Sequence, residues 1–389
     1  MTEDAPLHVV LAGGGSAGHI EPALALADAL CRRDARNEIT CIGTTRGGLD
    51  TRLIPARGYP LELIPAVPMP RKPTIDVFTV PSRLAGTVRR TVDVLDKARA
   101  DIVVGFGGHV ALPAYFAARR RSVPIVVHEA NVRPGLANRI GARMTEWIAT
   151  GSPDCRLSGG RYLGVPLRRM ISELDRRARR EEAIEFFGLR KDAVTLLVSG
   201  GSLGARRLNE AIEDAAEQFS AAGVQILHAL GRGAWRDDVE FPVSGAPYVR
   251  VPYLDRMDLA YAAADAMLCR GGMMTCSELA AVGLPAVYVP LPIGNGEQRL
   301  NAAPVVRAGG GLLVEDEELT PAWLAANLLP LLADREKLDE MGKAAAEFGR
   351  RNGDEALVDL VYEAVRGGAA EMAEAMVAAE ATVTAEADQ

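Results

Sequence analysis

The sequence is poor in aromatic residues and in cysteine, and it has no long apolar run. Phe, Trp and Tyr make up 5% of the 389 residues, and the five cysteines are scattered without C-x-x-C spacing. This cysteine pattern argues against a disulfide framework or a zinc site and favours a reducing compartment. No stretch reaches the roughly 18 uninterrupted apolar residues of a membrane-spanning helix. Any contact with a membrane is therefore expected to be peripheral.

Charge of one sign accumulates only in particular segments. The formal net charge is −7, but residues 354–389 carry nine acids and one arginine, so they contribute −8 and leave +1 for the rest. Within that rest, residues 67–121 hold ten Lys or Arg against four acids. Local charge rather than the overall pI should therefore govern the choice of partner.

Strand-like and helix-like segments alternate twice along the chain. The first series starts with LHVVLA, pauses at YLGVPLRR, and a second series restarts with VTLLVSGG. Such alternation predicts α/β domains with parallel sheets covered on both faces. We expect an N-terminal domain over residues 1–165 and a C-terminal domain over residues 166–345. A helix over residues 346–366 is expected to pack back on the N-terminal domain, and residues 367–389 to form an acidic, disordered Ala/Glu tail.

Two glycine-rich turns join a strand to a helix, at residues 13–19 and 199–205. Such turns let backbone N–H groups approach an anion, and the helix N-terminus adds positive potential. A dinucleotide site would also need an acid at the end of the second strand, but EITCIGTTRGG ends in Thr44, Thr45 and Arg46. The dehydrogenase interpretation is therefore disfavoured, and a nucleotide diphosphate remains the expected ligand.

A third glycine pair lies in CRGGMMTCSE, residues 269–278. The N–H groups of Met273, Met274 and Thr275 would form the free end of a helix and could hold a diphosphate, with Arg270 balancing its charge. Glu278, one turn further on, could accept hydrogen bonds from two ribose hydroxyls. The alternative for Glu278 is an ordinary first-turn helix acid.

Six ordered blocks resemble the UDP-N-acetylglucosamine transferases that complete lipid II in bacterial peptidoglycan synthesis. They are GGGSAGHIEPALALADAL, GFGGHVALPA, HEANVRPGLANR, GVPLR, SGGSLGARRLNE and CRGGMMTCSELAAVGLPAVYVPLP. The resemblance implies two Rossmann-like domains facing a cleft, the glycosyltransferase B type. It also implies UDP-GlcNAc as donor, lipid I as acceptor and, among possible partners, other proteins of cell-wall synthesis.

The resemblance further implies a set of site residues. Its candidate general base is His19, and no cofactor and no metal is implied. The donor contacts that match are Ser16, Ala17, Gly18, Asn131, Arg168, Ser202, Leu254, Gln298 and the turn from Met273 to Glu278.

His19 fits a general base from its position as well. It directly follows the first glycine turn, and an imidazole can take the proton of a sugar hydroxyl that attacks the anomeric carbon. Direct attack predicts inversion, with the leaving UDP stabilised by helix N-termini and Arg270. The alternative is a histidine that caps the helix or contacts phosphate. His109 and His128 could each be structural or acceptor-site groups, while His8 and His228 lie in apolar runs and are expected to be structural.

Residues 67–90 interleave apolar and basic side chains, as a peripheral membrane surface does. The proposed membrane contacts are Met69, Arg71, Lys72, Ile75, Val77 and Phe78. The alternative is a core loop followed by a solvated basic helix. Nucleic acid is disfavoured because no aromatic stacking platform accompanies the charge. With the resemblance, this segment places the protein at the cytoplasmic face of the cell membrane.

Some positions depart from the family pattern. Ser16 and Ala17 replace a Thr-Gly pair, Gly271 replaces a serine, and Glu297 with Gln298 replaces a Gln-Gln pair. Gln298 keeps the matching second position. Without the family match, Arg168 would be interpreted as an ordinary surface arginine.

Overall fold

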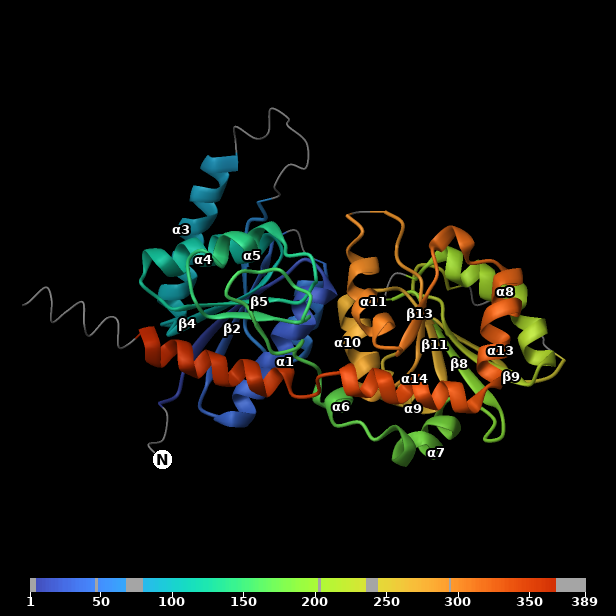
Figure 1. Ribbon diagram of the computed structural model, residues 1–389. Helices are drawn as coiled ribbons and strands as arrows, with labels where there is room; N and C mark the ends of the chain where they lie inside the picture. Colours follow the sequence, from blue (N-terminus) through green and yellow to red (C-terminus); the bar gives the residue numbers. More distant parts are fainter. Residues whose placement is uncertain are drawn as a thin grey trace, which may run out of the picture. The chain divides into compact units, whose positions relative to one another are not determined.

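The computed structural model describes residues 5–45, 48–67, 80–201, 204–235, 244–293 and 295–368. The chain divides into two compact units, one made of Met1–Pro166 with Asn352–Gln389 and the other of Leu167–Arg351. Each unit is built on one parallel sheet with helices packed against it (Figure 1). The expected pair of α/β domains with parallel sheets is confirmed.

The described residues of the first unit form a seven-stranded sheet in the order β3-β2-β1-β4-β5-β6-β7. Its strands are β1 (His8–Gly13), β2 (Glu38–Thr44), β3 (Leu61–Ile64), β4 (Ile102–Gly107), β5 (Ile125–Glu129), β6 (Ile148–Thr150) and β7 (Arg161–Tyr162). Its helices are α1 (Ala17–Arg33), α2 (Leu49–Ala56), α3 (Val80–Ala98), α4 (Gly108–Arg120), α5 (Leu136–Gly141) and a last helix over residues 353–368.

The central strands of this sheet are buried on both faces, as expected when helices cover both sides. The helix over 353–368 lies beside α1 (Figure 1), and its Leu357, Val361 and Tyr362 join one apolar core with α1 and β1. Arg32 on α1 also pairs with Asp354, at 2.6 Å. The last helix is therefore an integral part of the first unit.

The last helix begins at residue 353 rather than at 346. Residues 346–348 belong instead to α14, which ends at Phe348 because Gly349 leaves the helical conformation. A methyl group on Gly349 would lie 2.4 Å from the carbonyl carbon of Ala280, so this exit passes close against the second unit's α10. The tail from residue 369 onward lies outside the described residues.

The described residues of the second unit form a six-stranded sheet in the order β10-β9-β8-β11-β12-β13. Its strands are β8 (Val194–Ser199), β9 (Val224–Ala229), β10 (Tyr248–Val251), β11 (Ala266–Cys269), β12 (Ala286–Tyr288) and β13 (Gly311–Leu313). Its first helices are α6 (Arg169–Ser172), α7 (Arg176–Phe186), α8 (Arg206–Ala221), α9 (Met257–Ala263), α10 (Met273–Val282) and α11 (Glu297–Arg307).

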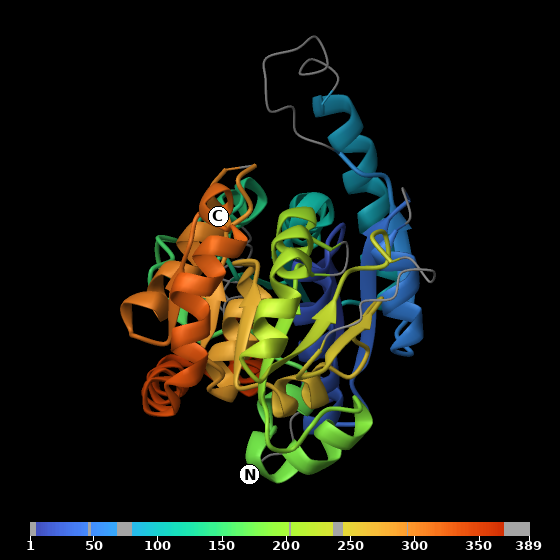
Figure 2. The ribbon, with the colours of Figure 1, turned by 90° about the vertical axis from the view of Figure 1, so that its right-hand side faces the viewer.

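The second unit closes with a run of short helical segments before a longer helix. These are a 3-10 turn (Asp316–Glu318), α12 (Pro321–Trp323), a π-helical stretch (Leu324–Leu328), α13 (Leu329–Ala333) and α14 (Arg335–Phe348). Figure 2 shows the yellow-green α8 lying across one face of the sheet. Its Leu208, Ile212 and Phe219 pack on that face, because they recur at helical spacing along one side.

Both sheets reverse their strand order at one place. In the first unit β1 and β4 are neighbours although β2 and β3 lie between them in sequence, and in the second unit β8 and β11 are neighbours in the same way. Ligands of open α/β sheets bind at the carboxyl ends of the strands beside such a switch point. All three glycine turns predicted from the sequence follow one of these strands.

Candidate functional site

The first glycine turn connects β1 to α1 at the switch point of the first sheet. Gly15 has φ +88, a left-handed conformation that glycine adopts without a steric penalty. Ser16 then has an extended backbone and precedes the first helical residue, Ala17. Ala17 lies inside the helix, so its side chain meets no positive φ. The Ala17 departure from the family pattern is therefore accommodated.

His19 lies between two turns of the first sheet. Its Nδ1 is 3.0 Å from Ser16 Oγ. A methyl group placed on Gly107, at the end of β4, would come within 3.2 Å of His19 Nε2 and 3.4 Å of Asn138 Nδ2. The imidazole is therefore packed against the turn after β4, at the edge where a ligand of this sheet is expected.

Asn131 is held at the same edge by a buried carboxylate. Glu129 ends β5, and its Oε1 accepts hydrogen bonds from the backbone N–H (2.9 Å) and side-chain amide (3.2 Å) of Asn131. Its Oε2 accepts from the N–H of Gly135 (2.9 Å) and from Asn138 Nδ2 (3.0 Å). Burial raises the pKa of Glu129, and these donors oppose the shift. Glu129 was not among the predicted site residues, although it ends a buried strand.

His128 and His228 are buried among structural hydrogen-bond partners. His128 is fully buried, its Nε2 lies 3.1 Å from the Gly164 carbonyl oxygen, and burial lowers its pKa to about 4. His228 contacts the Tyr248 hydroxyl and Asn209, and burial lowers its pKa to about 3. His109 is exposed on α4. Of the histidines left open by the sequence, His128 is therefore a structural hydrogen-bond partner.

The second glycine turn follows β8. Ser202 lies outside the described residues, but the glycines on either side, Gly201 and Gly204, have φ +91 and +79. A methyl group on Gly204 would sit 2.1 Å from the Leu230 carbonyl oxygen, so only glycine fits this close approach. The turn thereby brings the start of α8 against the end of β9.

The third turn places Glu278 in a hydrogen-bonded cluster. Gly272 precedes α10, so the N–H groups of Met273, Met274 and Thr275 lie in its first turn, where an α-helix supplies no acceptor for them. One turn on, the buried Glu278 accepts from Arg168 Nη2 (3.1 Å) and from the Tyr261 hydroxyl (2.7 Å). Two predicted residues that are 110 positions apart are thus in contact.

The Arg270 guanidinium is also held by hydrogen bonds. Its Nη1 donates to Asp316 Oδ1 (2.5 Å) and to the carbonyl oxygens of Val289 (3.1 Å) and Pro290 (3.3 Å). Asp316 offsets part of the positive charge, so an incoming diphosphate would rely more on the N-terminus of α10.

Leu254 and Gln298 lie near the same edge of the second sheet. Leu254 follows β10 and is buried in the apolar core of this unit. Gln298, in the first turn of α11, accepts the N–H of Leu291 at 2.9 Å. A methyl group on Gly271 would lie 2.5 Å from the Gln298 carbonyl oxygen. The glycine that replaces the family's serine therefore lets α11 approach the third turn.

The proposed membrane contacts, Met69, Arg71, Lys72, Ile75, Val77 and Phe78, lie outside the described residues. The neighbouring α3 is described, and its Arg83, Arg89 and Arg90 are exposed. Among the helices of the described ranges, none is long and apolar enough to span a membrane.

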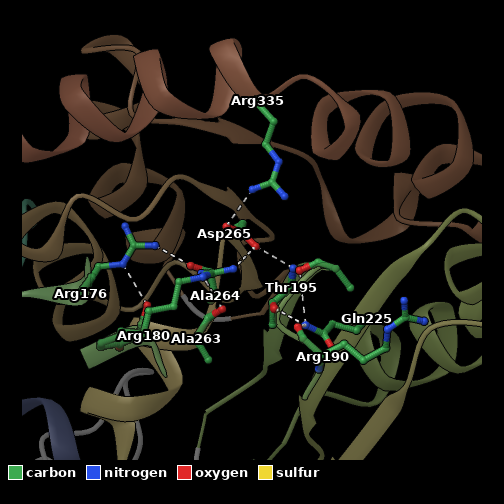
Figure 3. Close-up of polar contacts among 11 residues, drawn as sticks. Arg176, Arg180, Arg190, Thr195, Gln225, Ala263, Ala264, Asp265 and Arg335 are labelled. Carbon is green, nitrogen blue, oxygen red and sulfur yellow. Dashed lines mark hydrogen bonds and ion pairs between the residues drawn. The ribbon is translucent and has the colours of Figure 1, made fainter. Parts of the chain in front are cut away.

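A basic cavity lies at the opposite, amino-terminal edge of the second sheet. Its volume is about 610 Å³, and none of the predicted site residues lines it. Arg176 reaches the ends of α9 and α10, where it donates to the carbonyl oxygens of Tyr261 (2.9 Å), Ala264 (2.5 Å) and Gly283 (2.8 Å). Figure 3 shows the Arg176 side chain pointing toward Ala264. Burial lowers the Arg176 pKa to about 10. This arginine caps helix C-termini and thus has a structural role.

Two family models match most of the chain. The glycosyltransferase family 28 N-terminal domain matches residues 9–150, and the glycosyltransferase family 28 C-terminal domain matches residues 195–357. The chain belongs to glycosyltransferase family 28. The crystal structure of Acinetobacter baumannii MurG is 27% identical with a TM-score of 0.73, covering 92% of this chain and 100% of that chain. The family 28 fold seen here is the glycosyltransferase B type.

Curated relatives are still more similar in sequence than this crystal structure. A protein of Streptomyces avermitilis is 62% identical over 92% of this chain and 99% of its own length. A protein of Streptomyces coelicolor is 63% identical over 92% of this chain and 98% of its own length. Both are named UDP-N-acetylglucosamine--N-acetylmuramyl-(pentapeptide) pyrophosphoryl-undecaprenol N-acetylglucosamine transferase.

Proposed function

We propose that the protein transfers N-acetylglucosamine from UDP-GlcNAc to the 4-hydroxyl of MurNAc in undecaprenyl-pyrophosphoryl-MurNAc-pentapeptide. The acceptor is lipid I and the product lipid II, an intermediate of peptidoglycan synthesis. The names of the curated relatives support both substrates. The observation that carries the proposal is the contact of Arg168 and Tyr261 with Glu278, one turn from the free N-terminus of α10.

The second unit is proposed to bind the donor. The N–H groups of Met273, Met274 and Thr275 would hold the diphosphate, and the helix N-terminus would stabilise its charge. Glu278 would accept hydrogen bonds from the ribose. Gln298, Leu254, Ser202 and Arg270 complete the proposed donor contacts on this unit, and no metal is required by this arrangement.

The first unit is proposed to bind the acceptor and to supply the base. The acceptor 4-hydroxyl oxygen attacks the anomeric carbon while the bond from that carbon to the diphosphate oxygen breaks, and UDP leaves with the bonding electrons. His19 takes the hydroxyl proton at Nε2, with its Nδ1–H donated to Ser16 Oγ. Ser16, Ala17, Gly18 and Asn131 are proposed to contact the edge of the donor. One direct displacement inverts the anomeric centre.

We also propose peripheral binding to the cytoplasmic face of the cell membrane. The basic and apolar side chains of residues 67–90 support it, and the exposed Arg89 and Arg90 on α3 extend the basic surface. Reversing both charges to Glu should weaken binding to phosphatidylglycerol vesicles by about tenfold or more, at about 1 kcal/mol per cation. The matched reversal of Arg119 and Arg120, which are exposed at the end of α4, should have a smaller effect. Equal losses for both pairs would contradict a membrane surface at α3.

The transferase proposal is tested by UDP release with defined pairs of donor and acceptor. UDP should appear with UDP-GlcNAc and a lipid I analogue together, and little should appear with UDP-glucose or without acceptor. The alternative of a non-enzymatic module that senses UDP-sugars predicts binding of UDP-GlcNAc without turnover. A dehydrogenase would be thermally stabilised by NAD and not by UDP, which would overturn the proposal.

A further inference from the structure

Asp50 lies beneath the first glycine turn with both carboxylate oxygens engaged. It is fully buried in the first turn of α2. Its Oδ1 accepts the N–H of Gly15, and its Oδ2 accepts the N–H of Thr44, both at 2.9 Å. A buried carboxylate is costly unless such donors compensate for the loss of water. The chain therefore places its own anion at the turn after β1.

The surrounding glycines leave space for this carboxylate. A methyl group on Gly14 would lie 3.0 Å from Asp50 Oδ2, and one on Gly43 would lie 3.0 Å from Asp50 Cβ. Both approaches are tighter than ordinary van der Waals contact. The ends of β1 and β2 are thus shaped around Asp50.

The buried carboxylate changes the role of the first turn. A phosphate at Gly15 would have to compete for an N–H that already donates to Asp50, and it would meet a like charge at short range. The third turn, at the start of α10, has no such carboxylate among its described hydrogen bonds. The two turns therefore differ in chemistry although both are rich in glycine.

Gly15, the residue that Asp50 holds, directly precedes Ser16 in the chain, and Ser16 contacts His19. The Ser16 Oγ lies 3.0 Å from His19 Nδ1. With the proton on Nδ1, the lone pair of the imidazole is on Nε2, the atom that would take the acceptor proton. A shift of the backbone at Gly15 would move Ser16 and hence the imidazole.

We infer that Asp50 is a positioning residue, whose carboxylate fixes the first glycine turn so that Ser16 orients His19 for proton transfer. This inference rests on the proposed function of His19. It also explains why the first turn serves the reacting hydroxyl rather than the diphosphate.

The test uses the full-length chain with Asp50→Asn, which keeps the size but turns an N–H donor toward Gly15 or Thr44. We expect kcat to fall about 10–100-fold, because the proton acceptor is misplaced, while KM for UDP-GlcNAc changes less than about threefold. In a His19→Ala background the same substitution should have almost no further effect on kcat. The matched control is Asp101→Asn, because Asp101 Oδ2 accepts the N–H of His8 (2.7 Å) at the other end of β1.

A second readout does not depend on turnover. The amide resonance of Gly15 should shift in Asp50→Asn, and the ring-nitrogen spectrum of His19 should lose the preference for the Nδ1–H tautomer. If Asp50→Asn does not fold, Ser16→Ala, which leaves Asp50 in place, should give the same loss of kcat and of tautomer preference.

Full additivity of Asp50→Asn with His19→Ala would overturn the inference, and so would an unchanged His19 spectrum. A rise in KM for UDP-GlcNAc at constant kcat would instead make Asp50 part of donor binding and would overturn it too. If the wild-type protein releases no UDP while Asp50→Asn still shows these spectral changes, the proposed function is contradicted and the positioning role of Asp50 stands.

Discussion

Glu278 is the residue proposed to contact the ribose of the donor. Both of its carboxylate oxygens accept a hydrogen bond within the second unit, from Arg168 and from Tyr261. Replacement by Gln turns an amide N–H₂ group toward one of these donors. Two donors then face each other, and the buried donor of Arg168 or Tyr261 is left without an acceptor.

Glu278→Gln is expected to raise KM for UDP-GlcNAc by about 10–100-fold, equivalent to about 1–3 kcal/mol, with a smaller change in kcat. The measurement is steady-state kinetics at varied donor concentration. Glu173→Gln is the control, because Glu173 forms an exposed i,i+4 ion pair with Arg169. Equal KM values for the two variants would remove Glu278 from the donor site.

Two buried histidines make stability depend on pH. Burial lowers the pKa of His128 to about 4 and of His228 to about 3, below the usual value near 6.5. Between the folded-state pKa values and about pH 6.5, the unfolded chain binds more protons than the folded chain. The contribution of the two neutral rings to the free energy of unfolding is therefore fully present above about pH 6.5 and is lost as the pH falls.

His128 alone should cost the first unit about 2 kcal/mol on going from pH 7 to pH 5. Urea denaturation at several pH values measures this slope, and His128→Gln should flatten it. A stability that rises toward pH 5 would contradict the neutral, buried state of both rings.

Gly271 illustrates how an element is placed by one missing side chain. It lies in the turn between β11 and α10, and its Cα faces the Gln298 carbonyl oxygen at the start of α11. Gly271→Ala puts a methyl group 2.5 Å from that oxygen, so α11 must move.

The expected cost of Gly271→Ala is about 1–3 kcal/mol of stability in the second unit, together with weaker UDP binding. Thermal denaturation with and without UDP measures both. Gly272→Ala is the control, because its nearest neighbour is the Thr275 hydroxyl at 3.9 Å; it should cost less than about 1 kcal/mol. An unchanged transition for Gly271→Ala would contradict the close packing of α11.

The sequence was sufficient to predict the elements that carry the glycine turns. Strands such as LHVVLA and the helices after them have clear periodicities, and glycine at their junctions has a local reason. The start of the last helix was wrong by several residues, because the end of α14 at Gly349 depends on a tertiary contact with Ala280.

Asp50 and Tyr261 could not be predicted in the same way. Asp50 accepts the backbone N–H of Gly15 from another segment, and Tyr261 reaches Glu278 from a different helix. These partners follow from the fold and leave no local spacing in the sequence. The contact of Arg168 with Glu278 has the same origin. Glu129 bonds the loop that directly follows it, and its place at the end of a buried strand was the signal available in the sequence.

At the scale of the whole molecule, each unit has its own sheet and its own apolar core. The last helix returns to the first unit, so truncating its core should destabilise that unit alone. Leu357→Ala is expected to cost about 2–5 kcal/mol, because Leu357 is fully buried. Calorimetry should show the transition of the first unit moving to lower temperature while the affinity for UDP stays the same. A parallel loss of UDP affinity would contradict donor binding by the second unit.

The proposed reaction uses both units for one inverting transfer of N-acetylglucosamine to a lipid-linked acceptor. NMR analysis of the product formed from UDP-GlcNAc and a lipid I analogue tests it most directly. We expect one β-linked N-acetylglucosamine on the 4-oxygen of MurNAc for each UDP released. Free N-acetylglucosamine, an α-linked product or no product at all would contradict it.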